Sequence, residues 1–221
     1  MKKRLIIAID GPSGVGKSTV STLISQKLGI VKLESGALYR ALAYKALKLH
    51  VNYEDKRKFL DFLKTTQIEI KFKNHQTRVF LDGVDVSLKL RSEDVGNCAS
   101  QISKLHVVRK YLLGVQQNVG KSCDVVAEGR DMGTVVFPKA AYKFYLDAHP
   151  NVRAQRRHDE LKEKGSEPHF DDIAKDLEKR DFEDRTRQHS PLKRAHDAVV
   201  IDTSEKRVED VVAEILLRVR S

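Results

Sequence analysis

The chain has 221 residues and contains two cysteines, Cys98 and Cys123. This length allows one α/β domain with small inserts, and two isolated cysteines exclude a disulfide-rich scaffold and favour the reducing cytoplasm. The formal net charge is +10, most of it in residues 1–60, which hold 12 Lys/Arg against 4 Asp/Glu. The five apolar residues between Arg4 and Asp10 are too few for a signal peptide core, and no other stretch predicts a membrane span.

The first predicted element is a buried strand over Arg4–Asp10, which the motif GPSGVGKS at Gly11–Ser18 follows directly. The spacing G-x-x-x-x-G-K-S is typical of a loop whose N–H groups surround nucleotide phosphates, with Lys17 reaching the β and γ positions and the Ser18 hydroxyl on Mg²⁺. Helical spacing of apolar residues follows, so a helix N-terminus faces the anion. We predict an ATP or GTP site, the alternative being a glycine-rich turn that arose by chance. The expected ATP phosphate ligands are Gly11, Pro12, Ser13, Gly14, Val15, Gly16, Lys17, Ser18 and Thr19.

Four further short, β-branched runs predict parallel strands at Val31–Glu34, Asp124–Glu128, Lys143–Asp147 and Val199–Asp202. Helical patterns separate them, and the clearest is the apolar face within residues 208–219. This alternation predicts an α/β fold with a doubly wound, parallel five-stranded sheet, in which ligands bind at the carboxyl ends of the strands. Residues 1–221 are expected to form this one domain.

Two regions depart from the alternation. Residues 67–86 contain two runs of alternating apolar and polar residues joined by a turn at 73–76, so we expect a small antiparallel, substrate-side insert over about residues 60–95. Residues 151–188 hold 10 Lys/Arg and 11 Asp/Glu in a helical, charge-rich stretch, which predicts a helical lid.

The second lid helix carries an apolar stripe that becomes ionic. Its face of Phe170, Ile173 and Leu177 continues as Arg180, Asp184 and Arg187. Such a change suggests a helix that leaves the core and enters a wet cleft. The alternative is fraying into solvent with ordinary surface ion pairs.

Two further segments are candidates for binding the phosphoryl acceptor. SGALYR at Ser35–Arg40 follows a strand and begins a helix, so it offers a second helix N-terminus to an anion, unless it is an ordinary capped helix. EGRDMG at Glu128–Gly133 places a cation and a carboxylate at the ligand edge of the sheet, unless it is a plain surface turn.

Seven motifs together resemble the bacterial-type cytidylate kinases, which are P-loop nucleoside monophosphate kinases. In chain order they read GPSGVGKS, SGALYR, NCASQ, EGRDMGTVVFP, YLDA, RDFEDRTR and HSPLKRAHDAVVIDTS, and they span nearly the whole chain. The first motif occurs in many NTPases, whereas EGRDMGTVVFP and RDFEDRTR are narrow signals. The resemblance implies transfer of the γ-phosphoryl group of Mg²⁺-bound ATP to CMP or dCMP, by direct in-line attack of the acceptor phosphate.

The resemblance also implies roles for individual residues. Arginine forks bind phosphate bidentately and stay charged, which suits a transfer between two anions. A hydroxyl, an arginine and a carboxylate complement cytosine but not uracil, and Ser100, Arg109 and Asp131 would read the base in this way. The expected catalytic residues are Lys17, Arg130, Arg180 and Arg187, the CMP-binding residues are Ser35, Gly36, Tyr39, Arg40, Ser100, Arg109, Arg130, Asp131, Arg180, Asp184 and Arg187, and the metal ligand is Ser18.

Some positions stay open. Glu34 stands where the family commonly has aspartate, which leaves its role toward Mg²⁺ undecided. Arg157 and residues 203–207 are candidates for the adenine pocket by their position only. Arg109 has an alternative as a surface residue of a helix over 104–119, and Ser100 as a helix cap.

Other functions compete with the kinase hypothesis. One is a kinase of another small acceptor, such as a different nucleoside monophosphate or shikimate, and another is a non-catalytic nucleotide-binding module. A third is a P-loop ATPase that binds RNA or DNA through the basic residues Lys2, Lys3, Arg4, Lys56, Arg57 and Lys58. Sparse aromatic residues argue against nucleic acid. We expect ATP and CMP or dCMP as partners, no obligatory nucleic acid, no membrane, and a monomer.

Overall fold

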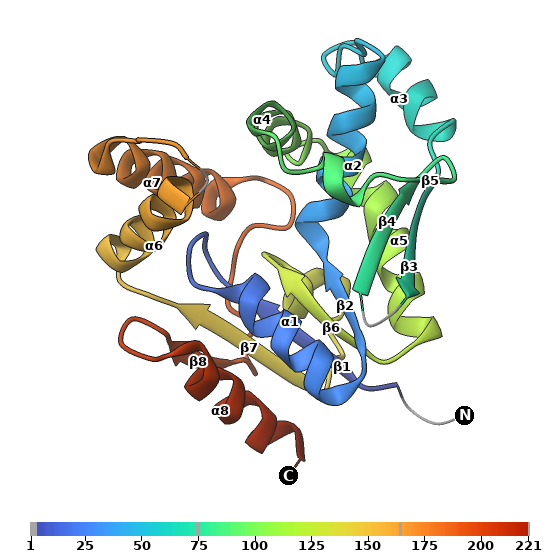
Figure 1. Cartoon of the computed structure of the whole chain (residues 1–221). Coiled ribbons are helices and arrows are strands. Elements are labelled where there is room, and N and C mark those ends of the chain that lie inside the picture. Colours follow the sequence, from blue (N-terminus) through green and yellow to red (C-terminus); the bar gives the residue numbers. More distant parts are fainter. Residues whose placement is uncertain (1–3, 74–75, 164, 221) are drawn as a thin grey trace.

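A computed structural model describes residues 4–73, 76–163 and 165–220 of the chain (Figure 1). Lys2, Lys3 and the expected turn residues Asn74 and His75 therefore lie outside the described residues, as does the side chain of Lys56. No helix in the described part of the chain is both long and apolar enough to cross a bilayer.

The larger sheet has five parallel strands in the order β2-β6-β1-β7-β8, which confirms the predicted doubly wound fold. Each expected strand is present, with its ends within two residues of the prediction. These short runs form strands because the centre of a parallel sheet is buried on both faces, where Ile7, Ala8, Val125 and Leu146 are fully buried. The strands are β1 (Ile6–Asp10), β2 (Val31–Glu34), β6 (Val125–Gly129), β7 (Tyr142–Asp147) and β8 (Val199–Asp202).

Helices cover both faces of this sheet. On one face, α1 (Lys17–Leu28) and α8 (Val208–Arg220) pack over side chains such as Ile7, Ile9 and Phe144. On the other face, α2 (Ser35–Lys48) and α5 (His106–Ser122) pack over Ala8, Leu33 and Ala127 in a second core cluster. The strand register brings the carboxyl ends of β1, β6 and β7 together at Asp10, Gly129 and Tyr145.

The region after α2 forms the small antiparallel sheet that the alternating runs predict. Its strands β3 (Ile68–Lys73), β4 (Gln76–Leu81) and β5 (Val84–Asp85) pair in that order, and Ile68 lies opposite Leu81. The flanking helices are α3 (Lys56–Lys64), the short η1 (Ser87–Lys89) and α4 (Glu93–Ile102), whose N-cap Ser92 accepts a hydrogen bond from the Val95 N–H.

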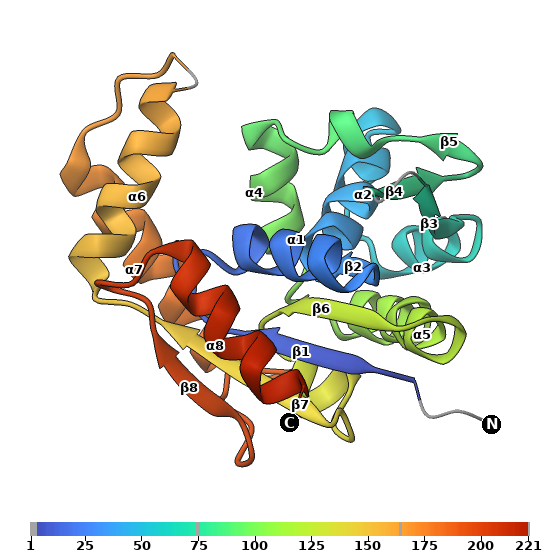
Figure 2. The same ribbon diagram turned by 60° about the horizontal axis from the view of Figure 1, so that its bottom comes forward.

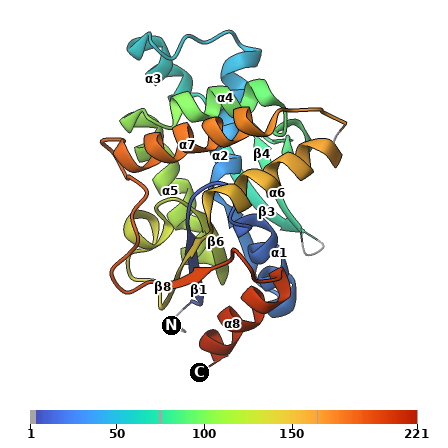
Figure 3. The same ribbon diagram turned by 90° about the vertical axis from the view of Figure 1, so that its left-hand side faces the viewer.

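The charge-rich region forms two helices, α6 (Pro150–Glu163) and α7 (Phe170–Thr186), which pack side by side (Figure 3). In Figures 1 and 2 this pair lies on one side of the molecule, and α3, α4 and the antiparallel sheet lie on the other. The end of β1 and the start of α1 lie between the two groups. The interpretation of residues 60–95 as a substrate-side insert and 151–188 as a lid stays a prediction.

Candidate active site

The loop of residues 11–16 joins the carboxyl end of β1 to α1. Its glycines have φ angles of 150° at Gly11, 80° at Gly14 and 87° at Gly16, a range that other residues rarely adopt. At Gly14 a Cβ atom would also lie 2.9 Å from the Cβ of Arg153, so the loop approaches α6 too closely for a side chain. The glycine spacing of the motif therefore has a steric cause in this fold.

Lys17 is buried beneath this loop, and its Nζ donates a hydrogen bond to the Pro12 carbonyl at 2.5 Å. Burial, and to a lesser extent the charge of Arg130, lower the pKa of Lys17 to about 7. A phosphate group beside the Nζ atom would favour the charged ammonium. The position of Lys17 is therefore suited to contact with an anion.

A run of polar contacts leads from the loop toward α7. Arg130, directly after β6, donates from Nη2 to Ser13 Oγ and from Nε to Asp184 Oδ2, both at 2.7 Å. The other oxygen of Asp184 pairs with Arg187 Nη1 at 3.0 Å. Two arginines thus meet at one carboxylate beside the phosphate loop, a cluster suited to holding an anionic group.

A buried ion pair lies next to this cluster. Arg109 Nη1 contacts Asp131 Oδ2 at 3.0 Å, and the guanidinium group lies 5.5 Å from the centroid of the Tyr39 ring. The Nε atom of Arg109 is buried and has no hydrogen-bond partner among the described residues. Tyr39, Arg109 and Asp131 line a cavity of about 250 Å³ together with Gln188 and Ser190.

The carboxyl group of Asp131 has a raised pKa, because burial outweighs the nearby charges of Arg109 and Arg187. It directly precedes a single π-helical turn, η2 (Met132–Val136), and such turns are frequent at functional sites. The N–H groups of Met132 and Gly133 each donate to Asp10 at 2.8 Å, which ties this turn to the end of β1.

Oxygen donors gather at the start of α1, where Ser18 is the expected metal ligand. The Nζ of Lys32 lies 2.8 Å from Ser18 Oγ, 3.4 Å from Glu128 Oε1 and 3.6 Å from Glu34 Oε2. A hydroxyl and two carboxylates that already surround a cation fit the preference of Mg²⁺ for oxygen. The described residues contain no cluster of three or more His, Cys, Asp or Glu that could hold a metal alone.

The other expected CMP-binding residues are more dispersed. Ser35 and Gly36 begin α2, and Arg40, one turn later, pairs with Glu34 at 3.2 Å. Ser100 lies in α4 and makes no side-chain hydrogen bond to Arg109 or Asp131 in the structure. Arg180 is exposed on α7, and none of the described residues pairs with it.

The candidates for an adenine pocket separate in the structure. Arg157 is bound to Glu160 on α6 at 2.8 Å. Thr203, in contrast, is buried and donates from Oγ1 to the Val15 carbonyl of the phosphate loop at 3.3 Å. The segment that begins at Thr203 therefore adjoins the loop, and its role toward adenine stays a prediction.

Sequence reasoning missed a buried ion pair between α6 and α7. Arg153 of α6 pairs with Asp181 of α7, the Asp181 carboxylate accepts from the Ser13 N–H at 3.4 Å, and Arg153 donates to the Ser13 carbonyl at 3.2 Å. Arg180, on the ionic continuation of the stripe, is exposed, whereas its neighbour Asp181 is buried. The i, i+4 spacing of Ile173, Leu177 and Asp181 was the available signal.

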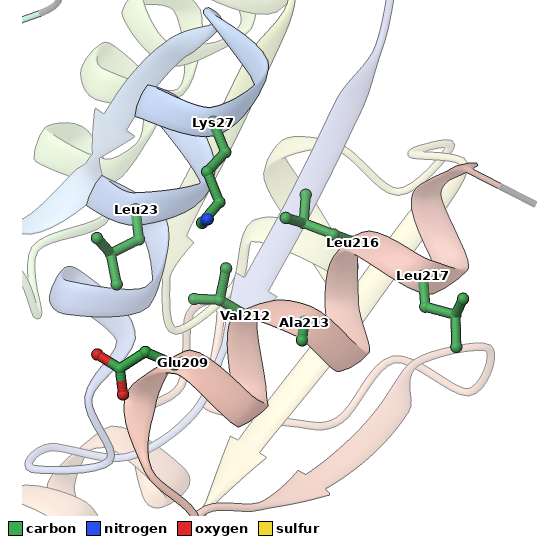
Figure 4. A pocket seen from close by; sticks show the side chains of 7 residues that line it. All are labelled: Leu23, Lys27, Glu209, Val212, Ala213, Leu216 and Leu217. Atoms are coloured by element: carbon green, nitrogen blue, oxygen red, sulfur yellow. The ribbon is translucent and has the colours of Figure 1, made fainter.

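A larger cavity lies elsewhere in the described part of the chain. A groove of about 580 Å³ between α1 and α8 is lined by Leu23, Lys27, Glu209, Val212, Ala213, Leu216 and Leu217 (Figure 4). Most of these side chains are apolar, and the groove has neither phosphate-binding backbone nor an arginine. The chemistry therefore favours the smaller cavity beside Arg109 and Asp131.

Known proteins show the same family over nearly the whole chain. The family model "Cytidylate kinase" matches residues 7–221. A cytidylate kinase of Caldicellulosiruptor bescii is 42% identical over 97% of this chain and 95% of its own length, and one of Thermodesulfovibrio yellowstonii is 45% identical over 99% and 98%. An uncharacterised protein from Eubacterium ventriosum shares the fold, with a TM-score of 0.52 and 11% identity over 99% of each chain. The chain belongs to the cytidylate kinase family.

Proposed function

We propose that this kinase transfers the γ-phosphoryl group of ATP to CMP and dCMP, giving ADP and CDP or dCDP. Residues 11–19 hold the ATP phosphates through backbone N–H groups, and Lys17 reaches the β- and γ-phosphates. Ser18 would hold Mg²⁺, and the bound ion would neutralise part of the phosphate charge. The acceptor phosphate is already an anion, so the protein needs to align two anions rather than supply a general base.

The observation that carries this proposal is the run of contacts from Ser13 through Arg130 and Asp184 to Arg187. It joins the donor loop to a cluster of arginines that suits the acceptor phosphate. Arg40 at the start of α2 completes the phosphate clamp. Arg180 is the exception, because its side chain is exposed, and we expect it to reach the substrate only after α7 moves inward.

Cytosine recognition is assigned to the buried pair of Arg109 and Asp131. A carboxylate accepts from the exocyclic amine of cytosine, and an arginine donates to the ring nitrogen and carbonyl. The unpartnered Nε of Arg109 offers a buried donor of this kind. Uracil reverses two of these polarities and would leave buried groups unpaired, which can reduce kcat/KM by roughly 10⁴.

The test is ADP formation from Mg-ATP with CMP, dCMP, UMP, AMP and shikimate supplied separately. We expect turnover with CMP and dCMP and little with the others. Asp131→Asn and Arg109→Met should lower kcat/KM for CMP by at least about tenfold. They should also lower the ratio of kcat/KM for CMP to kcat/KM for UMP, since the lost contacts are to the base. Lys121→Met, an exposed charge change in the last turn of the same helix as Arg109, is the matched control.

An RNA-containing reaction tests the competing function. A rate of ATP hydrolysis that rises with RNA, falls steeply with salt concentration and does not change with CMP would replace the kinase proposal with a nucleic-acid-dependent ATPase. Equal turnover of CMP and UMP would refute the roles of Arg109 and Asp131 and leave the transfer reaction standing. The monomeric state and the cytoplasmic location also stay predictions, the latter supported by the two free cysteines.

A further inference from the structure

Lys32 on β2 lies in a cage of oxygen atoms at the start of α1. Its ammonium group donates to Ser18 Oγ at 2.8 Å, to Thr22 Oγ1 at 3.0 Å and to the Ser18 carbonyl at 3.1 Å. An ammonium has three hydrogens, so these three acceptors use its full donor capacity. The side chain is 15% exposed, and its backbone carbonyl accepts a hydrogen bond from Thr77 Oγ1 at 2.6 Å.

Two carboxylates close the cage. Glu128 Oε1 is 3.4 Å and Glu34 Oε2 is 3.6 Å from the Lys32 Nζ, and the two glutamates are opposite each other in the β2–β6 register. Burial first, and then the charge of Glu34, raise the pKa of Glu128, while Lys32 opposes this rise. Lys32 therefore compensates negative charge that the fold concentrates at this point.

The same oxygen atoms form the donor set that suits a divalent cation. Ser18 Oγ is the ligand that the phosphate-loop motif provides for Mg²⁺, and Glu128 stands at the carboxyl end of the strand beside β1. A lysine ammonium that is hydrogen-bonded to Ser18 Oγ competes with a metal ion for that oxygen. Its positive charge also repels a divalent ion nearby.

We propose that the ammonium group of Lys32 occupies the cation position beside Ser18 and Glu128 before nucleotide arrives, and that it must release Ser18 Oγ when Mg-nucleotide binds. Lys32 thereby sets the Mg²⁺ concentration that the kinase requires. This inference rests on the proposed function, because it takes Ser18 as the ligand of a nucleotide-bound Mg²⁺.

The first test is Mn²⁺ binding in the presence of ADP, followed by electron paramagnetic resonance, together with the Mg²⁺ dependence of CDP formation. Lys32→Met removes the competing charge, so it should tighten Mn²⁺ binding and lower the KM for Mg²⁺ about tenfold. Lys32→Arg keeps the charge and should stay near the wild type. Lys27→Met, an exposed lysine in the last turn of α1, should change neither value.

Weaker or unchanged Mn²⁺ binding by Lys32→Met would overturn the inference. That result is distinct from failure of the proposed function, which would appear as CDP formation that needs no divalent ion, or as no CDP formation by the wild type.

A second test uses the wild-type protein and does not depend on the variant's folding. Acetic anhydride labels accessible lysines, and mass spectrometry reports the extent of labelling at Lys32 relative to Lys27. We expect Lys32 to be protected without ligand and with ADP plus EDTA, and to be labelled faster with Mg-ADP. Labelling that stays constant or decreases with Mg-ADP would mean that Lys32 keeps its place or binds the nucleotide, and would refute the release step.

Discussion

The buried carboxyl group of Asp10 shows how one residue orients the site. Asp10 is 3% exposed at the end of β1, and its carboxylate accepts hydrogen bonds from the N–H groups of Met132 and Gly133 in the turn that follows Asp131. Burial is the largest influence on this carboxyl group and raises its pKa from 3.8 to about 6, although both hydrogen bonds lower it. The carboxylate form is therefore less favourable in the folded chain than in water.

A pH dependence of stability follows from Asp10. The folded pKa lies above the unfolded value, so the folded state binds more protons between pH 4 and 6, and the stability contributed by the protonated form is lost as the pH rises through 6. The Asp10→Asn variant does not titrate. From pH 4 to 7 its free energy of unfolding, relative to the wild type, should rise by up to about 3 kcal/mol. Urea titrations across this range measure the difference, and a constant difference would contradict the prediction.

Single residues differ in how well the sequence reveals them. Lys17 and Ser18 were predictable because their motif is a local spacing whose backbone shape follows from its glycines. The contact of Arg130 with Asp184 joins positions 54 apart, so no local spacing could show it, and the two residues were grouped by their place at polar ends of elements and by the resemblance to a family. The sequence contains no indication of a functional role for Lys32, because a charged residue between apolar ones on a short strand is typical of the solvated edge of a sheet.

At the scale of helices, the pair of Arg153 and Asp181 connects α6, α7 and the phosphate loop. Both side chains are buried, and each also contacts the backbone of Ser13. Removing one partner of a buried pair leaves an uncompensated charge, which typically costs about 3–5 kcal/mol. The position of α6 and α7 is thus coupled to the loop that follows β1.

Asp181→Asn should therefore destabilise the α6–α7 pair and raise the KM for ATP. Asp176→Asn, an exposed change on the same helix, is the matched control and should leave both values near the wild type. Hydrogen exchange of α6 and α7 measures the first effect and steady-state kinetics the second. A double variant, Arg153→Met with Asp181→Met, should recover part of the lost stability, because no charge is then left buried alone. Equal exchange in Asp181→Asn and Asp176→Asn would show that the pair contributes nothing.

Elements were predicted better than the contacts between them. Five strands followed from short apolar runs, because burial on both faces of a parallel sheet demands such residues. The burial of Asp181 in α7 was missed, because a buried carboxylate resembles a surface residue until its partner is known. The i, i+4 spacing from Ile173 and Leu177 indicates that Asp181 faces inward, but its partner Arg153 lies 28 positions away on another helix, so no periodicity in α7 could reveal the pair.

Across the whole molecule, buried apolar side chains are unevenly distributed. Two large clusters cover the faces of the parallel sheet, whereas α6 and α7 share a small separate cluster of Ala154, Ile173 and Leu177. Segments with few buried contacts open locally at a lower free energy than the core. We therefore expect α6 and α7 to open without unfolding of the sheet, which is the property that a lid requires.

Two matched isoleucines test this division. Ile215 in α8 is fully buried against the sheet, and Ile215→Ala should lower the free energy of global unfolding by about 3 kcal/mol while kcat/KM changes little. Ile173 is 6% exposed in the small cluster between α6 and α7, and Ile173→Ala should accelerate hydrogen exchange of α6 and α7 and reduce kcat/KM. Its effect on global unfolding should be smaller than that of Ile215→Ala, because the sheet keeps both of its own clusters. If both variants lower the midpoint of global unfolding equally, α6 and α7 unfold together with the sheet, and the predicted lid closure would then have to be a rigid movement within one cooperative domain.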